Sequence, residues 1–233
     1  MIPGSFRRGI SSTTAEGRKA AAGSLSLRRT AFNSVCENGL LAHSQLGLWS
    51  DDHIGGLAKI AKACHEWGAP VLVQIHHGGY TSSSSIASPA LAPSDYRDES
   101  KHARAMSLEE IRETQEAFVA AARRAKQAGC DGVELHGAHG FLLSQFMSPL
   151  ANRRKDQYGG DLTDRTTFIR EIIERLKYEV KDDDFVLGYR MGGNEPGLKE
   201  GIEIARILEA AGVELLHDSS KCPNFYHELY GKH

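Results

Sequence analysis

Short apolar runs alternate with amphipathic segments along the chain from about residue 50 onward. The apolar runs cover residues 70–75, 133–136, 185–190 and 213–217. The other segments, at about 51–67, 107–128, 164–180 and 199–211, repeat their apolar residues at helical spacing. Strands that alternate with helices of this length indicate βαβ units and a parallel sheet. Nearly continuous apolar runs suit strands that are covered on both faces.

The clearest helix boundary is at Ser107. Ser107 and Glu110 have the spacing of a capping box, in which each side chain bonds the other residue's backbone N–H. Leu108, Ile111 and Phe118 follow at helical spacing, and Gly129 ends the pattern. We therefore expect a long helix immediately before the apolar run at 133–136.

A parallel sheet of this kind either closes into a (β/α) barrel or stays open as a doubly wound sheet. No Gly-x-Gly-x-x-Gly follows the first apolar run, which disfavours the dinucleotide-binding open sheet. We expect an α/β fold, an incomplete (β/α)8 TIM barrel. The sequence contains four clear strands and a possible fifth near residues 8–14, too few to close a barrel.

The first 44 residues differ from the rest, with six basic residues, two acids and many Ser and Thr. Such a composition is typical of an organelle transit peptide, or it marks an atypical first part of the domain, which we favour. We expect an atypical N-terminal segment at 1–44, which could hold a remnant of the first strand. A partial barrel at 45–220 and a C-terminal tail at 221–233 would follow it.

Composition and charge narrow the classes of partner. The net charge of -2, with 40% hydrophobic and 25% charged residues, gives no reason to expect nucleic acid or an anionic membrane. No apolar run is long enough to span a bilayer. The four cysteines are far apart and form no Cys-x-x-Cys pair, which disfavours a zinc site or a disulfide scaffold. We expect a reduced, cytoplasmic protein.

Two histidines at the end of a strand are the leading candidates for chemistry. His136 ends the run at 133–136, and His139 follows in a loop bounded by Gly137 and Gly140. The loops after barrel strands form the pocket, where two imidazoles can donate hydrogen bonds to a substrate oxygen that gains negative charge. A metal pair and a structural role in capping the loop are the alternatives; we expect no metal.

Gln74 and Arg190 are candidates for binding a planar ligand, because both lie late in buried strands. A buried amide needs partners, which a flat ligand with donors and acceptors or the neighbouring backbone could supply. A guanidinium at a strand end needs an anion or an electron-rich ring, or an ion pair with Glu134 or Asp218. His76 and His77 point in opposite directions on a strand, so at most one faces the barrel mouth.

The assembled motifs resemble the old yellow enzyme family of NADH:flavin oxidoreductases, particularly its bacterial ene-reductase and enoate-reductase-like branch. The motifs, listed in order, are Leu72-Val73-Gln74-Ile75-His76-His77-Gly78-Gly79, Asp131-Gly132-Val133-Glu134-Leu135-His136-Gly137-Ala138-His139-Gly140, Gln145-Phe146-Met147-Ser148-Pro149-Leu150, and Arg153-Arg154 with Asp156, Tyr158-Gly159-Gly160 and Arg165. The similarity covers about residues 46–220. By itself, the basic run at 152–160 has the composition of a solvated loop that braces the next helix.

The resemblance implies a barrel that holds FMN at its carboxyl face. Gln74 and Arg190 would bind the flavin, Thr14 would lie beside it, and His136 and His139 would bind the substrate oxygen. The activity would be reduction of activated alkenes (α,β-unsaturated carbonyl compounds) with NADH or NADPH as reductant. The substrate would be a small molecule, and the protein could form a homo-oligomer.

The chain departs from the family pattern in three places. Phe141 stands where many members have a tyrosine that donates a proton, and phenylalanine has none to give. The first strands match poorly, and the last two strands, with their phosphate-binding residues, are absent, so the barrel looks truncated. The alternatives are a non-catalytic or weakly flavin-binding barrel fragment, and a phosphate-binding lyase or isomerase on the same fold.

Overall fold

The computed structural model describes residues 25–26, 33–97, 101–193 and 197–219. Its centre is a parallel sheet of order β1-β3-β7-β8-β9, in which β2 also pairs with β3. The strands are β1 (Leu25–Ser26), β2 (Asn33–Ser34), β3 (Val71–His76), β7 (Gly132–Gly137), β8 (Val186–Met191) and β9 (Leu215–Asp218). Because β7 occupies the other edge of β3, β1 and β2 act as two pieces of one interrupted strand.

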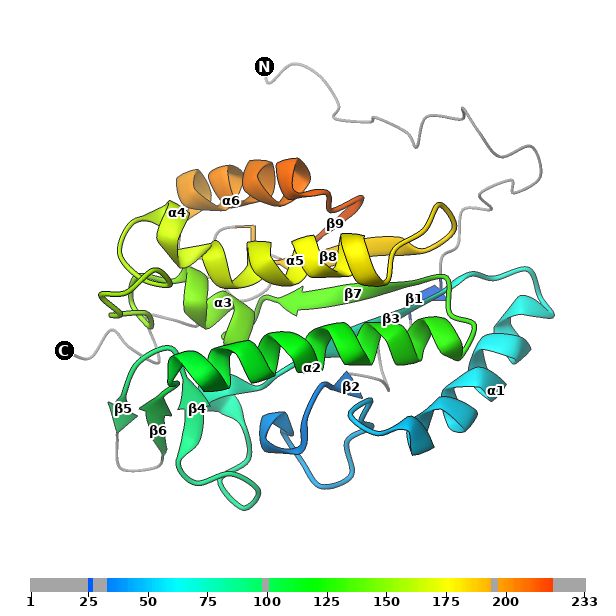
Figure 1. Ribbon diagram of the computed structural model, residues 1–233, viewed down its shortest axis with the longest axis horizontal. Coiled ribbons are helices and arrows are strands. Elements are labelled where there is room, and N and C mark those ends of the chain that lie inside the picture. Colours follow the sequence, from blue (N-terminus) through cyan, green and yellow to red (C-terminus); the bar gives the residue numbers. More distant parts are fainter. Residues whose placement is uncertain (1–24, 27–32, 98–100, 194–196, 220–233) are drawn as a thin grey trace.

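The longer helices lie along one side of this sheet (Figure 1). They are α1 (Ile54–His65), α2 (Leu108–Gln127), α5 (Thr167–Glu179) and α6 (Leu198–Ala211), with the short α3 (Leu142–Met147) and α4 (Leu162–Arg165) between β7 and α5. Alternate strand residues such as Val73, Val133 and Leu187 pack against helix residues such as Phe118 and Ile172. The other face of the strands is therefore left for polar side chains.

The sequence pattern predicted these main elements correctly. The capping box at Ser107 is present, because Ser107 Oγ accepts from the N–H of Glu110 at 3.1 Å and the Glu110 carboxylate accepts from the N–H of Ser107 at 2.9 Å. The predicted helix at 51–67 begins instead as a 3-10 turn, Asp51–His53, before α1. The predicted helix at 164–180 is divided into α4 and α5, because Thr166 interrupts it.

Some elements were not predicted. A second sheet combines β4 (Ala90–Ala92), β5 (Tyr96–Arg97) and β6 (His102–Ala105) in the order β4-β6-β5. These strands have two to four residues, too few for an apolar pattern to be recognised. β1 and β2 likewise extend the main sheet to residues before the predicted boundary at 45. The strand expected near residues 8–14 lies outside the described residues.

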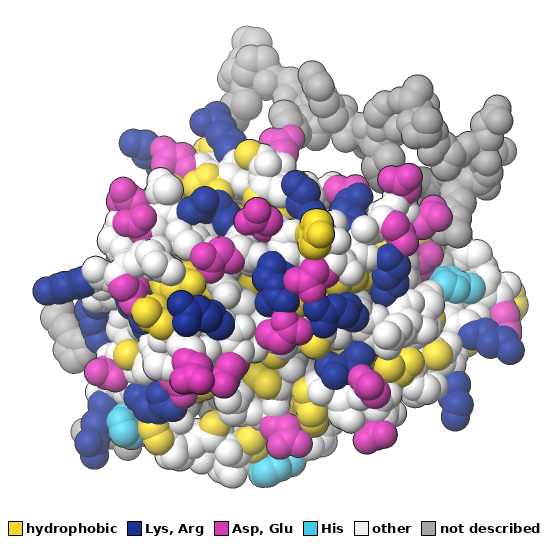
Figure 2. All heavy atoms as spheres, viewed as in Figure 1, with side chains coloured by type: hydrophobic (Ala, Val, Ile, Leu, Met, Phe, Trp, Pro, Cys, Tyr) yellow, Lys and Arg dark blue, Asp and Glu magenta, His cyan; other side chains and the backbone are white. Residues whose placement is uncertain are grey.

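Opposite charges alternate on the outer surface of the helices. Arg123 and Arg175 each bond both Glu116 and Glu179, which joins α2 to α5. Figure 2 shows basic and acidic side chains interspersed over this face, with no large area of one sign. In the described part of the chain, no helix has the length and apolar character needed to cross a membrane.

Gly137, at the end of β7, is fixed by a close contact with β8. A Cβ atom at Gly137 would lie 1.7 Å from the hydroxyl oxygen of Tyr189, which is fully buried. We expect Gly137→Ala to lower the free energy of unfolding by about 1–3 kcal/mol, because the tyrosine must move within a packed core. Urea denaturation measures this change.

The control for this prediction is Gly56→Ala in α1. A Cβ atom at Gly56 meets nothing within 4 Å, so alanine should stabilise the helix by about 0.5–1 kcal/mol. Gly137→Ala with wild-type stability would contradict the steric role assigned to Gly137.

Candidate active site

Polar side chains from adjacent strands meet on the inner face of the sheet, at the carboxyl ends of the strands. Gln74 of β3 pairs in register with Glu134 of β7, and His136 of β7 pairs with Arg190 of β8. Residues two apart on a strand point to the same side, so Glu134 and His136 share this face. The structure therefore brings the predicted candidates Gln74, His136 and Arg190 together. The candidate Thr14 lies outside the described residues.

His136 lies in an aromatic cluster with His139 and Phe141. The ring centroids of His136 and His139 are 5.1 Å apart, and those of His136 and Phe141 are 4.7 Å apart in an edge-to-face arrangement. The ring of His76 lies 5.2 Å from that of Phe141. Phe141 thus lies against both His136 and His76 and offers them no polar hydrogen.

Arg190 and His139 are linked through Ser219. The Arg190 guanidinium donates to Ser219 Oγ at 2.9 Å, and Ser219 Oγ lies 2.8 Å from His139 Nε2. Glu134, considered from the sequence as an ion-pair partner of Arg190, instead contacts Gln74 and lies 3.0 Å from His217 Nδ1. Arg190 is therefore tied to the histidine loop rather than to Glu134.

The Gln74 side chain is held by a charged group rather than by backbone. Its amide nitrogen Nε2 donates to Glu134 Oε1, and both residues are buried. One partner of the buried amide is therefore a side chain and not the neighbouring backbone. The residues on this face offer an amide, a guanidinium and imidazoles, a set that could hold a planar ligand with alternating hydrogen-bond donors and acceptors.

Burial keeps the site histidines neutral. Desolvation lowers the pKa of His76 to about 3, with a smaller effect from the nearby His77. It also lowers the pKa of His136 well below its usual value, with further lowering from His76, His139, Arg190 and His217. The pKa of His139 is lowered by burial, with further lowering from the nearby Arg190 and His217. At neutral pH each of these imidazoles carries one ring N–H and is uncharged.

His77 points away from the site, in keeping with the expected alternation along β3. Its Nδ1 accepts from the N–H of Gly79 at 2.9 Å, and its Nε2 lies 3.1 Å from Asn38 Oδ1. Burial lowers the pKa of His77 to about 4. His77 therefore holds the loops after β2 and β3 together.

Sequence reasoning missed three members of the site: Ser219, His217 and the role of Glu134. Ser219 and His217 lie at the end of β9, where the rule that chemistry follows strand ends could have identified them. No local pattern indicates that Glu134 contacts Gln74 and His217. Among the residues that the structure describes, no group of three or more His, Cys, Asp or Glu side chains could hold a metal ion.

His139 has an uncommon backbone conformation. Its φ is 59°, in the left-handed region that residues other than glycine rarely adopt. Gly140 follows with a φ of 69°. The turn therefore accommodates an imidazole at a position that would suit glycine. Strained residues of this kind concentrate at functional sites, where the surrounding structure holds them in place.

We expect His139→Gly to be more stable than His139→Ala by about 1 kcal/mol. Both variants lose the imidazole and its contact with Ser219, but only alanine keeps the strain of a side chain in the left-handed region. Thermal and urea unfolding of the two variants measure the difference. Greater stability of the alanine variant would contradict the strain at position 139.

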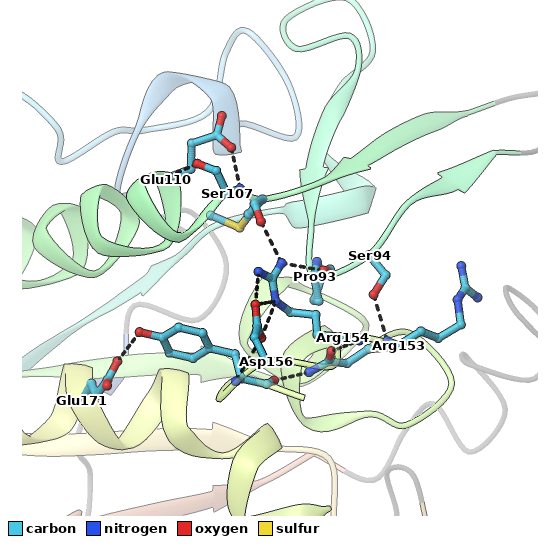
Figure 3. A network of polar contacts seen from close by, with 11 residues as sticks. Pro93, Ser94, Ser107, Glu110, Arg153, Arg154, Asp156 and Glu171 are labelled. Carbon is cyan, nitrogen blue, oxygen red and sulfur yellow. Dashed lines mark hydrogen bonds and ion pairs between the residues drawn. The ribbon is translucent and has the colours of Figure 1, made fainter. Parts of the chain in front are cut away.

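The basic run at 152–160 joins the segment after β4 to the segment before α2 (Figure 3). The Arg154 guanidinium donates to the carbonyl oxygens of Pro93 and Met106, at 2.9 and 2.7 Å, and pairs with Asp156 at 2.6 Å. Tyr158 bonds Glu171 of α5 at 2.9 Å. The expected bracing of the next helix is present, but Arg154 is not solvated, because only 10% of its side chain is exposed.

Comparison with known proteins identifies a family. The model of the NADH:flavin oxidoreductase / NADH oxidase family matches residues 15–221. An NADPH dehydrogenase from Halalkalibacterium halodurans is 40% identical over 205 residues, which are 86% of this chain and 60% of that protein. An NADH oxidase from Thermoanaerobacter brockii is 41% identical over 189 residues, which are 76% of this chain and 28% of that protein.

Solved structures share the fold. A complex of 2-naphthoyl-CoA reductase with 2-naphthoyl-CoA matches with a TM-score of 0.73 and 29% identity, over 81% of this chain and 32% of that one. An old yellow enzyme homologue from Zymomonas mobilis matches with a TM-score of 0.71 and 25% identity, over 80% of this chain and 57% of that one. The chain thus has the fold of part of these barrels, as predicted. It spans 60% or less of the length of these four proteins.

Proposed function

The chain belongs to the NADH:flavin oxidoreductase / NADH oxidase family, and from this premise we propose that it is an FMN-dependent NAD(P)H oxidoreductase of the ene-reductase type. Its acceptors would be small α,β-unsaturated carbonyl compounds. The proposal includes a cytoplasmic location and allows self-association. It rests on the side chains at the carboxyl ends of β3, β7 and β8.

The inner face suits the pyrimidine edge of a flavin. That edge alternates carbonyl acceptors with an N–H donor, and Gln74 and Arg190 supply an amide and a guanidinium on adjoining strands of this face. When bound, FMN would supply hydride transfer from NAD(P)H to the acceptor. The guanidinium would stabilise negative charge at the N1 side of the ring, where electrostatic effects on reduction are large.

His136 and His139 would bind the carbonyl oxygen of the acceptor. Their rings lie 5.1 Å apart, and both are neutral at neutral pH because burial lowers their pKa values. A neutral imidazole can donate its ring N–H to an oxygen that gains negative charge as the alkene is reduced. This pair of imidazoles beside Gln74 and Arg190 is the observation that carries the proposal.

Flavin uptake by the purified chain tests the proposal. We expect the protein to be yellow, or to become yellow with added FMN, and its visible absorbance to bleach with NADPH or NADH. Recovery of the absorbance with 2-cyclohexen-1-one would establish the proposed acceptor class. A colourless protein that cannot take up FMN would instead favour a non-catalytic barrel.

A further inference from the structure

Glu134 is the buried carboxylate on the inner face. It lies directly opposite Gln74 in the register of β3 and β7, and the exposed fractions of the two residues are 4% and 5%. Gln74 Nε2 donates to Glu134 Oε1, and His217 Nδ1 lies 3.0 Å from Glu134 Oε2. Both oxygens of the carboxylate therefore contact nitrogen atoms from other strands of the sheet, Gln74 on β3 and His217 on β9.

This arrangement determines which end of the Gln74 amide is available. An ionised carboxylate has no hydrogen to donate, so it can bond only the NH2 end of an amide. With its NH2 group bound to Glu134, Gln74 has its carbonyl oxygen directed elsewhere. Without the carboxylate, the amide could flip and swap the positions of its carbonyl oxygen and its NH2 group at little cost in free energy.

We propose that Glu134 is a positioning residue, which holds the Gln74 amide so that its carbonyl oxygen is presented to the N–H group of a bound flavin. This inference rests on the proposed function. The Glu134 carboxylate also places a negative charge beside Gln74, and this charge repels the extra electron density of a reduced flavin ring. Removal of that charge should therefore favour binding of the reduced cofactor.

The chain contains a matched pair outside the site. Gln115 Nε2 of α2 donates to Glu171 Oε2 of α5 at 2.6 Å, and Glu171 also accepts from the Tyr158 hydroxyl at 2.9 Å. This pair has the same chemistry, but it joins two helices on the outer side of the sheet. Glu171→Gln thus reproduces the loss of a carboxylate from a glutamine pair, here a partly buried one, without changing the inner face.

The first measurement uses the protein without flavin. In the wild type, NMR should show one Gln74 side-chain amide proton that is hydrogen-bonded and exchanges slowly with solvent. Glu134→Gln should speed this exchange, whereas Glu171→Gln should not. A Gln74 amide that exchanges and rotates freely in the wild type would overturn the proposal.

The second measurement compares affinities for oxidised and dithionite-reduced FMN. We expect Glu134→Gln to change the ratio of the two affinities by about tenfold in favour of reduced FMN, a rise in midpoint potential of about 30 mV. Glu134→Asp keeps the charge but is one methylene shorter. It should therefore weaken binding of oxidised and reduced FMN equally, which keeps the wild-type ratio of the two affinities. If Glu134→Gln does not fold, this variant and the wild-type NMR decide the question.

Two outcomes of the second measurement would overturn the inference: an unchanged ratio in Glu134→Gln, or the same change in Glu171→Gln. If the wild-type chain takes up no FMN, the proposed function fails. The NMR measurement then still decides whether Glu134 holds the Gln74 amide.

Discussion

Phe141→Tyr is expected to raise kcat/KM for 2-cyclohexen-1-one by about a hundredfold, because a positioned acid contributes at least this much to a step that needs a proton. Reduction of an enone adds a hydride to one alkene carbon and a proton to the other. Phe141 lies 4.7 Å from His136, beside the proposed binding site for the substrate oxygen, and has no proton to donate. Its replacement supplies a hydroxyl at the edge of the cluster.

A quinone acceptor provides the control for this variant. The protons that complete quinone reduction go to oxygen atoms, which exchange protons with water without a positioned acid. Steady-state rates with 1,4-benzoquinone should therefore be the same in wild type and Phe141→Tyr. If the enone rate does not rise while FMN and quinone reduction are retained, a missing proton donor does not limit the reaction.

Acid should destabilise the fold steeply between pH 6 and pH 5. His76, His77 and His136 are buried, and desolvation lowers their pKa values, to about 3 for His76 and about 4 for His77. In the unfolded chain their pKa is about 6.5, so below that pH the unfolded state binds more protons than the folded state. The contribution of these histidines to the free energy of unfolding is fully present well above a pH of about 6.5. It is lost as the pH falls toward the folded pKa values.

The unfolded state should bind nearly three more protons than the folded state in this range. The unfolding free energy should therefore change by about 4 kcal/mol per pH unit. Urea denaturation at several pH values between 5 and 7 measures it. His77→Gln should remove about a third of the slope, whereas His102→Gln should leave it unchanged, because His102 is exposed. A slope that His77→Gln does not reduce would show that His77 is protonated in the folded state.

Local sequence signals predicted the frame of the molecule. The apolar runs that became β3, β7 and β8 were visible because each has several residues and pairs with similar runs. Ser107 marked the start of α2, and Gly129, which has a φ of 80°, marked its end. These features depend on residues that are close in sequence, so the amino-acid sequence alone is enough to predict them.

Features that depend on distant residues could not be predicted in the same way. β1 and β2 have two residues each and exist through pairing with β3. Arg154 resembled a surface residue until Pro93 and Met106, which lie far from it in sequence, supplied carbonyl acceptors. In the site, the positions of His136 and Arg190 followed from strand ends, whereas the contact of Glu134 on β7 with His217 on β9 passes over β8.

The left-handed backbone at His139 makes this position respond oppositely to two kinds of selection. In a library selected only for thermal stability, glycine should accumulate at 139, because it relieves the strain at a φ of 59°. In a library selected for turnover, histidine should persist despite its cost. The residue recovered at position 139 would thus report, from sequencing alone, whether a population of variants was retained for its fold or for its chemistry.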